Sequence, residues 1–352
     1  MQTEIAENRQ SHFDRRSCLP HISWVSHGFE KREQRVSICF DNNQWALILG
    51  GSSGFGLAAA KKLASHGMSI AVVHRDRRGA MKTIEPEFDQ IREGGGEFLS
   101  FNLDALSQEG RETVLDELTK KLGTTGRIRT LMHSIAFGNL RLIAPLTDEF
   151  GSEAERDRQS LADKLGVGVD DLTEAVKLVF EESGGNSLVH LTDPPPYDAS
   201  AVLEEEDFER TVYSMGTSLA TWTQAVFEAR LFSSDARILS MTSEGNEVAW
   251  RGYAAVAAAK VALESVSRAI AVEYAPHGIR SNVVQAGVTD SAALRLIPGS
   301  NHLKASACLR NPFGRLTSAE EVANVIFLLS TDEASWINGT IVRVDGGEHI
   351  AG

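Results

Sequence analysis

Short apolar runs alternate with longer amphipathic segments along the chain from Trp45 onward. The first of these segments read "WALILG", "GLAAAKKLASHG", "MSIAVVH" and, after a polar stretch, "EFLSFNLD". A strand-length apolar run followed by a helix-length amphipathic segment is typical of β-α-β units with parallel strands. The runs "RIRTLMHSIA", "ARILSMTS", "RSNVVQAG" and "TIVRVDGG" continue the pattern. We therefore predict an α/β fold with a doubly wound, seven-stranded parallel sheet.

The alternation is interrupted between about residues 140 and 207. There "SLADKLGVGVDDLTEAVKLVFEE" has apolar residues at roughly helical spacing, and "TDPPPYD" then breaks the pattern with three consecutive prolines. This predicts a helical insertion after the fourth strand. Residues 1–40 are polar and lack a periodic apolar pattern, so we expect an irregular extension there and a single domain over residues 41–352.

The formal net charge of −13 is concentrated in the insertion. Residues 148–209 contain 18 acidic and 4 basic residues, so the rest of the chain is close to neutral. This balance argues against nucleic acid as a partner. In contrast, no acidic residue lies between Asp290 and Glu320, and an acidic partner could dock on that stretch. Its basic residues include Arg295, Lys304, Arg310 and Arg315.

The composition also narrows location and metal content. The cysteines Cys18, Cys39 and Cys308 are odd in number and far apart, which argues against a disulfide framework and a zinc site, and we expect no bound metal. No apolar run is long enough to cross a bilayer, and the first residues lack the apolar core of a signal peptide. We expect no membrane association and a cytoplasmic location.

A glycine-rich stretch, "LGGSSGFGLAAAKKLA", places Gly50, Gly54 and Gly56 between the first strand and the first helix. Glycine is required where the backbone turns sharply and approaches a pyrophosphate, whose charge then lies at the positive helix N-terminus. The alternative is an ordinary tight turn. Because the loop stands between a strand and a helix that leads to a second strand, the context favours dinucleotide binding.

The end of the second strand, "VVHRDRRG", bears on which dinucleotide is bound. An acidic residue at this point would accept hydrogen bonds from the adenosine ribose, whereas basic residues attract a 2′-phosphate. His74 is followed by Arg75, Arg77 and Arg78, which favours NADPH over NADH. Asp76 could instead face the ribose.

Tyr253 and Lys260 lie seven residues apart in the predicted helix "RGYAAVAAAKVALESV". Residues at this spacing are separated by only about 20° around a helix and roughly 10 Å along it, so both side chains would face one cleft. The ammonium of Lys260 could hold ribose hydroxyls, and Tyr253 could stabilise or protonate negative charge that develops on a substrate oxygen. The alternative is a tyrosine packed on the core beside a lysine whose ammonium reaches solvent.

With these motifs the chain resembles the short-chain dehydrogenase/reductase superfamily over roughly residues 43–350, except the insertion. The supporting pieces are the glycine loop, "NLD" ending at Asp104, the Tyr253/Lys260 helix, "NPFGRLTSAEEVA" and "VDGG". The commonest members place tyrosine four residues before lysine, where this chain has Val256. A gap of seven, together with "HSIAFG" at residues 133–138, resembles the branch of enoyl-acyl-carrier-protein reductases.

The resemblance implies a Rossmann fold and a set of cofactor contacts. Asp104 would approach the adenine, Gly287, Val288 and Thr289 would line the carboxamide, and the Ser291 hydroxyl would contact the pyrophosphate. The implied cofactor-binding residues are Gly50, Ser52, Gly54, Phe55, Gly56, Arg75, Asp104, Ala105, Ser134, Ile135, Ala136, Lys260, Gly287, Val288, Thr289 and Ser291. The segment "AALRLI" that follows could flank an acyl chain or form a plain surface helix.

Ser243 is 17 residues before Lys260, where carbonyl-reducing relatives carry a catalytic serine and many enoyl reductases an aromatic residue. It could hydrogen-bond a substrate carbonyl or satisfy backbone groups at a strand end. Met215, near the usual catalytic asparagine, argues against the proton relay of carbonyl reductases. We interpret His133 as part of a strand end.

The sequence thus predicts catalytic roles for Tyr253, Lys260 and Ser243 in an NADPH-dependent reductase of trans-2-enoyl thioesters, on acyl carrier protein or coenzyme A, in fatty-acid or polyketide metabolism. The alternatives are a 3-oxoacyl or other carbonyl reductase and an NADPH-binding regulatory protein. The resemblance further implies a homodimer or homotetramer. The insertion could cover the acyl site or block the usual assembly.

Overall fold

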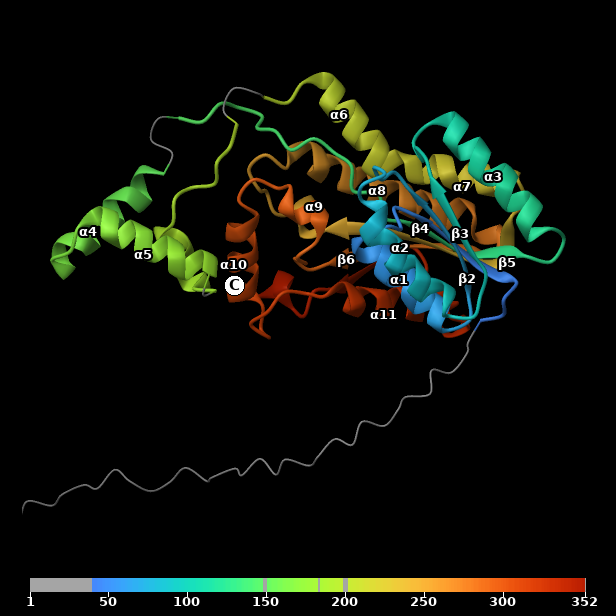
Figure 1. Ribbon diagram of the computed structural model, residues 1–352. Coiled ribbons are helices and arrows are strands. Elements are labelled where there is room, and N and C mark those ends of the chain that lie inside the picture. The colour runs from blue at the N-terminus through green and yellow to red at the C-terminus, as the bar shows by residue number, and fades with distance from the viewer. Residues whose placement is uncertain (1–39, 148–150, 183, 199–201, 352) are drawn as a thin grey trace, which may run out of the picture. The chain divides into compact units, whose positions relative to one another are not determined.

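The computed structural model describes residues 40–147, 151–182, 184–198 and 202–351; the expected extension, apart from residue 40, lies outside them. In this described part, seven parallel strands form one sheet in the order β3-β2-β1-β4-β5-β6-β7 (Figure 1). The predicted doubly wound sheet is therefore present. The strands are β1 (Gln44–Leu49), β2 (Ser69–His74), β3 (Phe98–Asn102), β4 (Arg127–His133), β5 (Phe232–Ser243), β6 (Ile279–Ala286) and β7 (Ile341–Val344).

Helices cover both faces of the sheet, as the nearly continuous apolar character of the strands requires. Ala59, Phe88 and Ile326 represent one buried cluster, beneath α1 (Gly54–Ser65), α2 (Met81–Arg92) and α11 (Ala319–Ser330). The second cluster includes Leu118, Trp222 and Leu263. These residues come from α3 (Gln108–Leu122), α7 (Ser218–Glu228) and α8 (Ala254–Glu273), on the opposite face in Figure 1.

The strand order reverses between β1 and β4. In an open parallel sheet, ligands bind outside the carboxyl ends of the strands at such a reversal, because the connecting helices leave toward opposite faces there. This edge carries the glycine-rich turn after β1 and the segment that starts at Ser134 after β4.

The predicted helical insertion follows β4. It contains α4 (Ser152–Leu165), α5 (Val169–Glu182) and the 3-10 turn η1 (Asn186–Leu191). Its two connections to the sheet domain run in parallel, since Leu142 and Val202 form a bridge and the Leu203 N–H donates to the Leu142 carbonyl at 2.8 Å. The chain then continues through α6 (Glu205–Val212) and a π-helical turn at Tyr213–Thr217 into α7.

After β6 the chain forms the short helices α9 (Ala292–Arg295) and α10 (Ser300–Arg310) before α11. The 3-10 turn η1 of the insertion packs on α10. Within the described residues, no helix is both long and apolar enough to cross a membrane.

The turn between β1 and α1 depends on close backbone packing. A Cβ on Gly56 would lie 2.0 Å from the Gly50 carbonyl oxygen, a distance that requires the backbone to move. We expect Gly56→Ala to lower the free energy of unfolding by about 1–3 kcal/mol, measured by urea denaturation. Gly79→Ala is the control, since a Cβ there meets nothing within 4 Å. Equal stability of the two variants would contradict this account of the turn.

Candidate active site

The glycine-rich turn brings the ends of β1 and β4 together. Gly50 has a φ of +88°, and a Cβ there would lie 2.5 Å from the carbonyl oxygen of Ser134, so only glycine fits. Phe55 turns its side chain into the core beneath the sheet, whereas Ser52 is half-buried in the turn. Ile135 packs against the opposite core cluster, and Ala136 is exposed.

The start of α1 is open to a ligand. The Ser53 side chain forms no capping hydrogen bond with the described residues, and the first turn contains no acidic residue. Its backbone N–H groups therefore remain available for an anion, which the helix dipole also favours. A Cβ built on Gly54 would first meet Ser291 Cβ, at 4.0 Å. Among the described residues no other atom comes within 4 Å of the Cβ built on Gly54, so protein side chains do not fill the space next to Gly54.

At the end of β2 the structure pairs Asp76 with His74. The His74 ring lies between the Asp76 carboxylate, 2.8 Å from Nδ1, and the Ser100 hydroxyl, 3.0 Å from Nε2. This contact turns the Asp76 carboxylate toward the buried imidazole. The side chains of Arg77 and Arg78 are exposed.

Arg75 lies across the expected adenine side of the site. Its Nη1 donates to Asp104 Oδ2 at 2.9 Å, and its guanidinium lies over the Phe137 ring, 4.5 Å from the centroid. Ala105 is buried, and its carbonyl accepts a hydrogen bond from the Trp222 indole at 2.9 Å. Phe137, which belongs to the "HSIAFG" segment, was not among the predicted site residues.

The end of β5 contacts three polar side chains of α8 or its cap. The Lys260 ammonium donates to the Met241 carbonyl at 2.8 Å. One residue on, Thr242 Oγ1 donates to Glu264 at 2.6 Å. Lys260 and the buried Glu264, one turn apart on α8, thus both contact the end of β5. Glu264 was not among the predicted residues, although an acidic residue four positions after the lysine is visible in the sequence.

Tyr253 and Ser243 lie side by side at this strand end, with 3.4 Å between the two hydroxyl oxygens. Tyr253 occupies the N-cap position of α8, and the regular helix begins at Ala254. The angle expected between Tyr253 and Lys260 from ideal helix geometry therefore does not strictly apply. Burial raises the pKa of Tyr253, and the Ser243 hydroxyl partly opposes this. Tyr253 is therefore a neutral hydrogen-bond donor at physiological pH.

The wall beside Tyr253 is apolar. Met215, Val256 and Ala259 form a small buried cluster, against which the Tyr253 ring packs. Met215 lies in the π-helical turn. Val256, where the commonest members carry tyrosine, and Met215, near their asparagine, thus belong to one apolar cluster.

His133 is buried at the end of β4, and its Nε2 lies 2.8 Å from the Ser218 hydroxyl. Burial, assisted by the charge of Lys260, lowers the pKa of His133 to about 3. It therefore stays neutral under ordinary conditions, which agrees with a role at a strand end.

The segment after β6 is held by several contacts. The Val288 N–H donates to Glu348 Oε2 at 3.2 Å, and the Val288 carbonyl accepts the Thr317 N–H at 3.1 Å. The Thr289 hydroxyl donates to the Gly287 carbonyl at 3.1 Å. Ser291 accepts the Leu294 N–H as the cap of α9.

Two family models match the chain. One, described as short chain dehydrogenase, matches residues 44–149, and the other, described as Enoyl-(Acyl carrier protein) reductase, matches residues 195–349. The chain belongs to the short-chain dehydrogenase/reductase superfamily. Neither match includes residues 150–194, so the insertion helices are an addition to the superfamily domain.

Among curated members of the superfamily, the 1-cyclohexenylcarbonyl-CoA reductase of Streptomyces collinus is 26% identical over 313 residues, covering 88% of each chain. The 3-oxoacyl-acyl-carrier-protein reductase FabG of Escherichia coli is 26% identical over 249 residues, covering 69% of this chain and 98% of its own. The protein is thus an oxidoreductase of this superfamily. It is similar both to a reductase of an enoyl-type CoA thioester and to a 3-oxoacyl-acyl-carrier-protein reductase.

Solved structures agree on the fold. An enoyl-acyl-carrier-protein reductase (NADH) from Aquifex aeolicus matches with a TM-score of 0.62 and 24% identity, covering 88% of this chain and 97% of its own. A short chain dehydrogenase from Burkholderia cenocepacia, in complex with NADP, matches with a TM-score of 0.62 and 21% identity, covering 89% and 99%.

The superfamily fold binds NAD or NADP, and the residues present fit such a cofactor. The Gly50 turn leaves no room for a side chain, the Ser53 side chain does not cap the start of α1, and among the described residues only Ser291 comes within 4 Å of a Cβ built on Gly54. Lys260 is only 6% exposed, and burial lowers its pKa to about 8, although Glu264 opposes this. An ammonium in this environment is stabilised by any ribose hydroxyl that comes within hydrogen-bonding distance.

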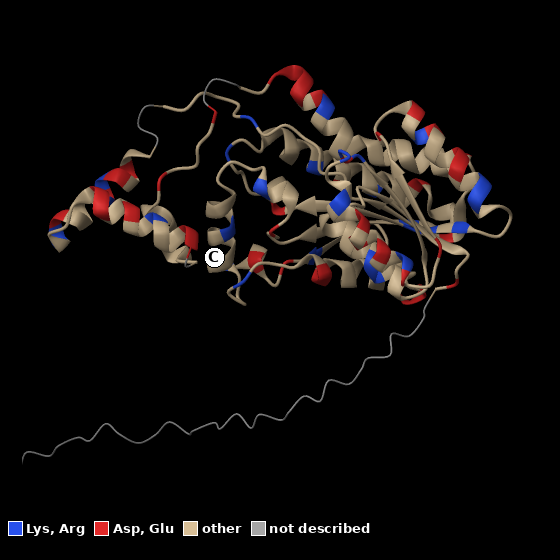
Figure 2. Ribbon diagram, in the orientation of Figure 1, with Lys and Arg blue, Asp and Glu red and all other residues tan. Residues whose placement is uncertain are grey.

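The four basic residues that suggested an acidic partner all pair with carboxylates of the same chain. Arg295 pairs with Asp290 at 3.0 Å, and Lys304 lies 3.8 Å from the same carboxylate. Arg310 pairs with Glu244 at 2.7 Å, and Arg315 with Glu321 at 2.6 Å. Figure 2 shows that acidic residues predominate at the start of α6.

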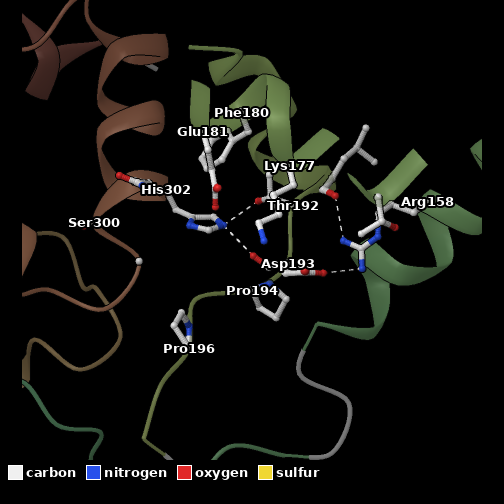
Figure 3. A pocket seen from close by; sticks show the side chains of 14 residues that line it. Arg158, Lys177, Phe180, Glu181, Thr192, Asp193, Pro194, Pro196, Ser300 and His302 are labelled. Carbon is white, nitrogen blue, oxygen red and sulfur yellow. Dashed lines mark hydrogen bonds and ion pairs between the residues drawn. The ribbon is translucent and has the colours of Figure 1, made fainter. Parts of the chain in front are cut away.

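A cavity of about 250 Å³ lies between the insertion and the start of α10 (Figure 3). His302 of α10 faces the segment after η1, where its Nε2 lies 2.8 Å from the Thr192 hydroxyl and 3.0 Å from the Asp193 carbonyl. Asp193 also pairs with the buried Arg158 at 2.9 Å. Gly299, which lines the cavity, lies next to Trp250, three residues before Tyr253. The Trp250 indole N–H donates to the Pro298 carbonyl at 3.4 Å.

The lowered pKa of Lys260 predicts how stability changes with pH. The folded protein releases the Lys260 proton near pH 8 and the unfolded chain near pH 10.5, so the unfolded state binds more protons between these values. The buried charge of Lys260 lowers the free energy of unfolding, and this effect is fully present below pH 8. As the pH rises toward 10.5, the free energy of unfolding recovers by roughly 3 kcal/mol.

We expect the free energy of unfolding of the wild type, relative to Lys260→Met, to increase across this interval in urea denaturation without cofactor. Methionine has a similar length and does not titrate. The same pH slope in both proteins would show that Lys260 titrates normally.

Proposed function

We propose that the protein is an NADPH-dependent reductase of trans-2-enoyl thioesters. The observation that carries this proposal is the arrangement around Tyr253. This tyrosine precedes Lys260 by seven residues, while Val256, at the more common tyrosine position, is buried against Met215. The match to the Enoyl-(Acyl carrier protein) reductase model and the likeness to a reductase of a conjugated CoA thioester support the same chemistry.

When bound, NADPH supplies the hydride that adds to the β-carbon of the enoyl group. The Tyr253 hydroxyl donates a hydrogen bond to the thioester oxygen, where negative charge then develops, and stabilises that charge. Because burial keeps Tyr253 protonated, the hydroxyl is a donor throughout this step. Lys260, oriented by the Met241 carbonyl, would hold ribose hydroxyls, and a proton passed from it along these hydroxyls and Tyr253 would reach the α-carbon. Hydride at the β-carbon and this proton at the α-carbon complete the reduction of the double bond. The apolar wall of Met215 and Val256 excludes water from the reacting carbons.

One observation favours a second candidate, reduction of a 3-oxoacyl thioester. Ser243 is 3.4 Å from the Tyr253 hydroxyl, so both could bind the same carbonyl oxygen. The likeness to 3-oxoacyl-acyl-carrier-protein reductase supports this reading. The two functions differ in the role of Ser243, which only the carbonyl reductase requires.

The deciding experiment measures NADPH oxidation with crotonyl and longer 2-enoyl thioesters beside 3-oxoacyl thioesters, each on coenzyme A and on acyl carrier protein. We expect turnover of the enoyl substrates, a loss of about a hundredfold or more in Tyr253→Phe, and little change in Ser243→Ala. Tyr274→Phe, at the far end of α8, is the matched control.

Preference for the 3-oxoacyl substrates, with strong dependence on Ser243, would replace the proposal by the second candidate. NADPH binding without turnover of either class would identify a regulatory protein instead.

The preference for NADPH is proposed to depend on Arg75, because the Asp76 carboxylate is engaged by His74. We expect Arg75→Ala to raise the Kd for NADPH roughly tenfold, the loss of one charged hydrogen bond, and to leave the Kd for NADH nearly unchanged. Arg92→Ala is the control, since Arg92 also pairs with a carboxylate and lies over a phenylalanine ring. Equal changes in both Kd values, measured by nucleotide fluorescence, would contradict a phosphate contact by Arg75.

A further inference from the structure

A network of charged side chains connects the end of β5, next to Tyr253, to the segment after β6. Arg310, the last residue of α10, donates to both carboxylate oxygens of Glu244, each at 2.7 Å. The same guanidinium also reaches Glu348 Oε1 at 3.2 Å. Glu348 is 1% exposed, so its charge requires the cation beside it.

Each carboxylate of this network reaches one side of the candidate site. Glu244 directly follows Ser243, whose hydroxyl lies beside Tyr253. Glu348 Oε2 accepts the Val288 N–H at 3.2 Å and would lie 3.0 Å from a Cβ on Gly287. A single guanidinium therefore fixes both the strand end next to the tyrosine and the segment that is expected to line the nicotinamide.

Hydrogen bonds on either side of Glu348 hold its backbone in place. Asn311, next to Arg310, donates to the Asp345 carbonyl at 2.9 Å. The Asp345 carboxylate accepts the N–H groups of Gly347 and His349, at 2.9 and 3.1 Å. The end of α10 thus holds the backbone on which Glu348 stands as well as its carboxylate.

We propose that Arg310 and Glu348 are positioning residues that hold Gly287, Val288 and Thr289 in the conformation that binds the nicotinamide end of the cofactor. Glu348 accepts the Val288 N–H, and Arg310 joins Glu348 to the strand end at Glu244 through two hydrogen bonds to the Glu244 carboxylate. His349, next to Glu348, approaches the same carboxylate less closely, at 3.6 Å. The inference rests on the cofactor binding in the proposed function, but not on the identity of the thioester.

Two measurements on the full-length protein test it. The first is the Kd for NADPH, determined by fluorescence. We expect Arg310→Gln and Glu348→Ala to raise it roughly tenfold, because the segment must then be ordered on binding. The second is amide hydrogen exchange over residues 286–291 without cofactor, which should accelerate in both variants.

Two further variants separate positioning from general stability. Arg315→Gln removes another two-bonded pair, with Glu321, that does not touch the Gly287–Thr289 segment. We expect it to leave the Kd and the exchange unchanged. Glu348→Gln keeps an oxygen that can accept the Val288 N–H, and should recover much of the NADPH affinity that Glu348→Ala loses.

Unchanged Kd and exchange in Arg310→Gln and Glu348→Ala, with only a lower melting temperature, would overturn the inference. Equal losses in Glu348→Gln and Glu348→Ala would also overturn it. Failure of the wild type to reduce enoyl thioesters would refute the proposed function alone, because the nucleotide Kd and the exchange rates do not depend on that substrate.

Discussion

The polar contacts between the end of β5 and α8 determine the geometry of the candidate site. Three consecutive residues of the strand, Met241, Thr242 and Ser243, contact Lys260, Glu264 and Tyr253 in turn. A second donor, the Asn246 amide at 2.6 Å, binds the same Glu264 oxygen as Thr242 does. Because Thr242, Lys260 and Glu264 are buried, any rotation of α8 would leave a buried charge or hydroxyl without a partner. The helix is therefore fixed in rotation as well as in position.

The superfamily fold and much of the site could be predicted because their signals are local. The strand and helix periods, the glycines after the first strand and the spacing of Tyr253 and Lys260 all lie within short windows of sequence. The Arg310–Glu348–Val288 contacts join residues that are distant in sequence, and nothing in their local patterns distinguishes them from surface ion pairs. The basic run after Asp290 illustrates the converse, since the sequence shows four cations that could meet an acidic partner but not the carboxylates of the same chain with which they pair.

The end of β2 shows why one residue type is insufficient to predict cofactor preference. Asp76 stands where an acidic side chain could accept hydrogen bonds from a ribose, yet its carboxylate lies 2.8 Å from the His74 ring. That contact depends on Ser100 of the neighbouring strand, which binds the other ring nitrogen. The conformation of Asp76 thus follows from the pairing of β2 with β3, which spacing along the chain does not reveal.

Helix α10 carries His302 near its start and Arg310 at its end, eight residues or roughly 12 Å apart along the axis. The first touches the insertion beside the cavity, and the second holds the carboxylates next to the cofactor segment. A helix of this length moves as a rod. A molecule in the cavity that favours one position of α10 would change the affinity for the cofactor by some factor. The cofactor must then change the affinity of the cavity for that molecule by the same factor. An addition that lies outside the superfamily domain would in this way be thermodynamically linked to the nucleotide.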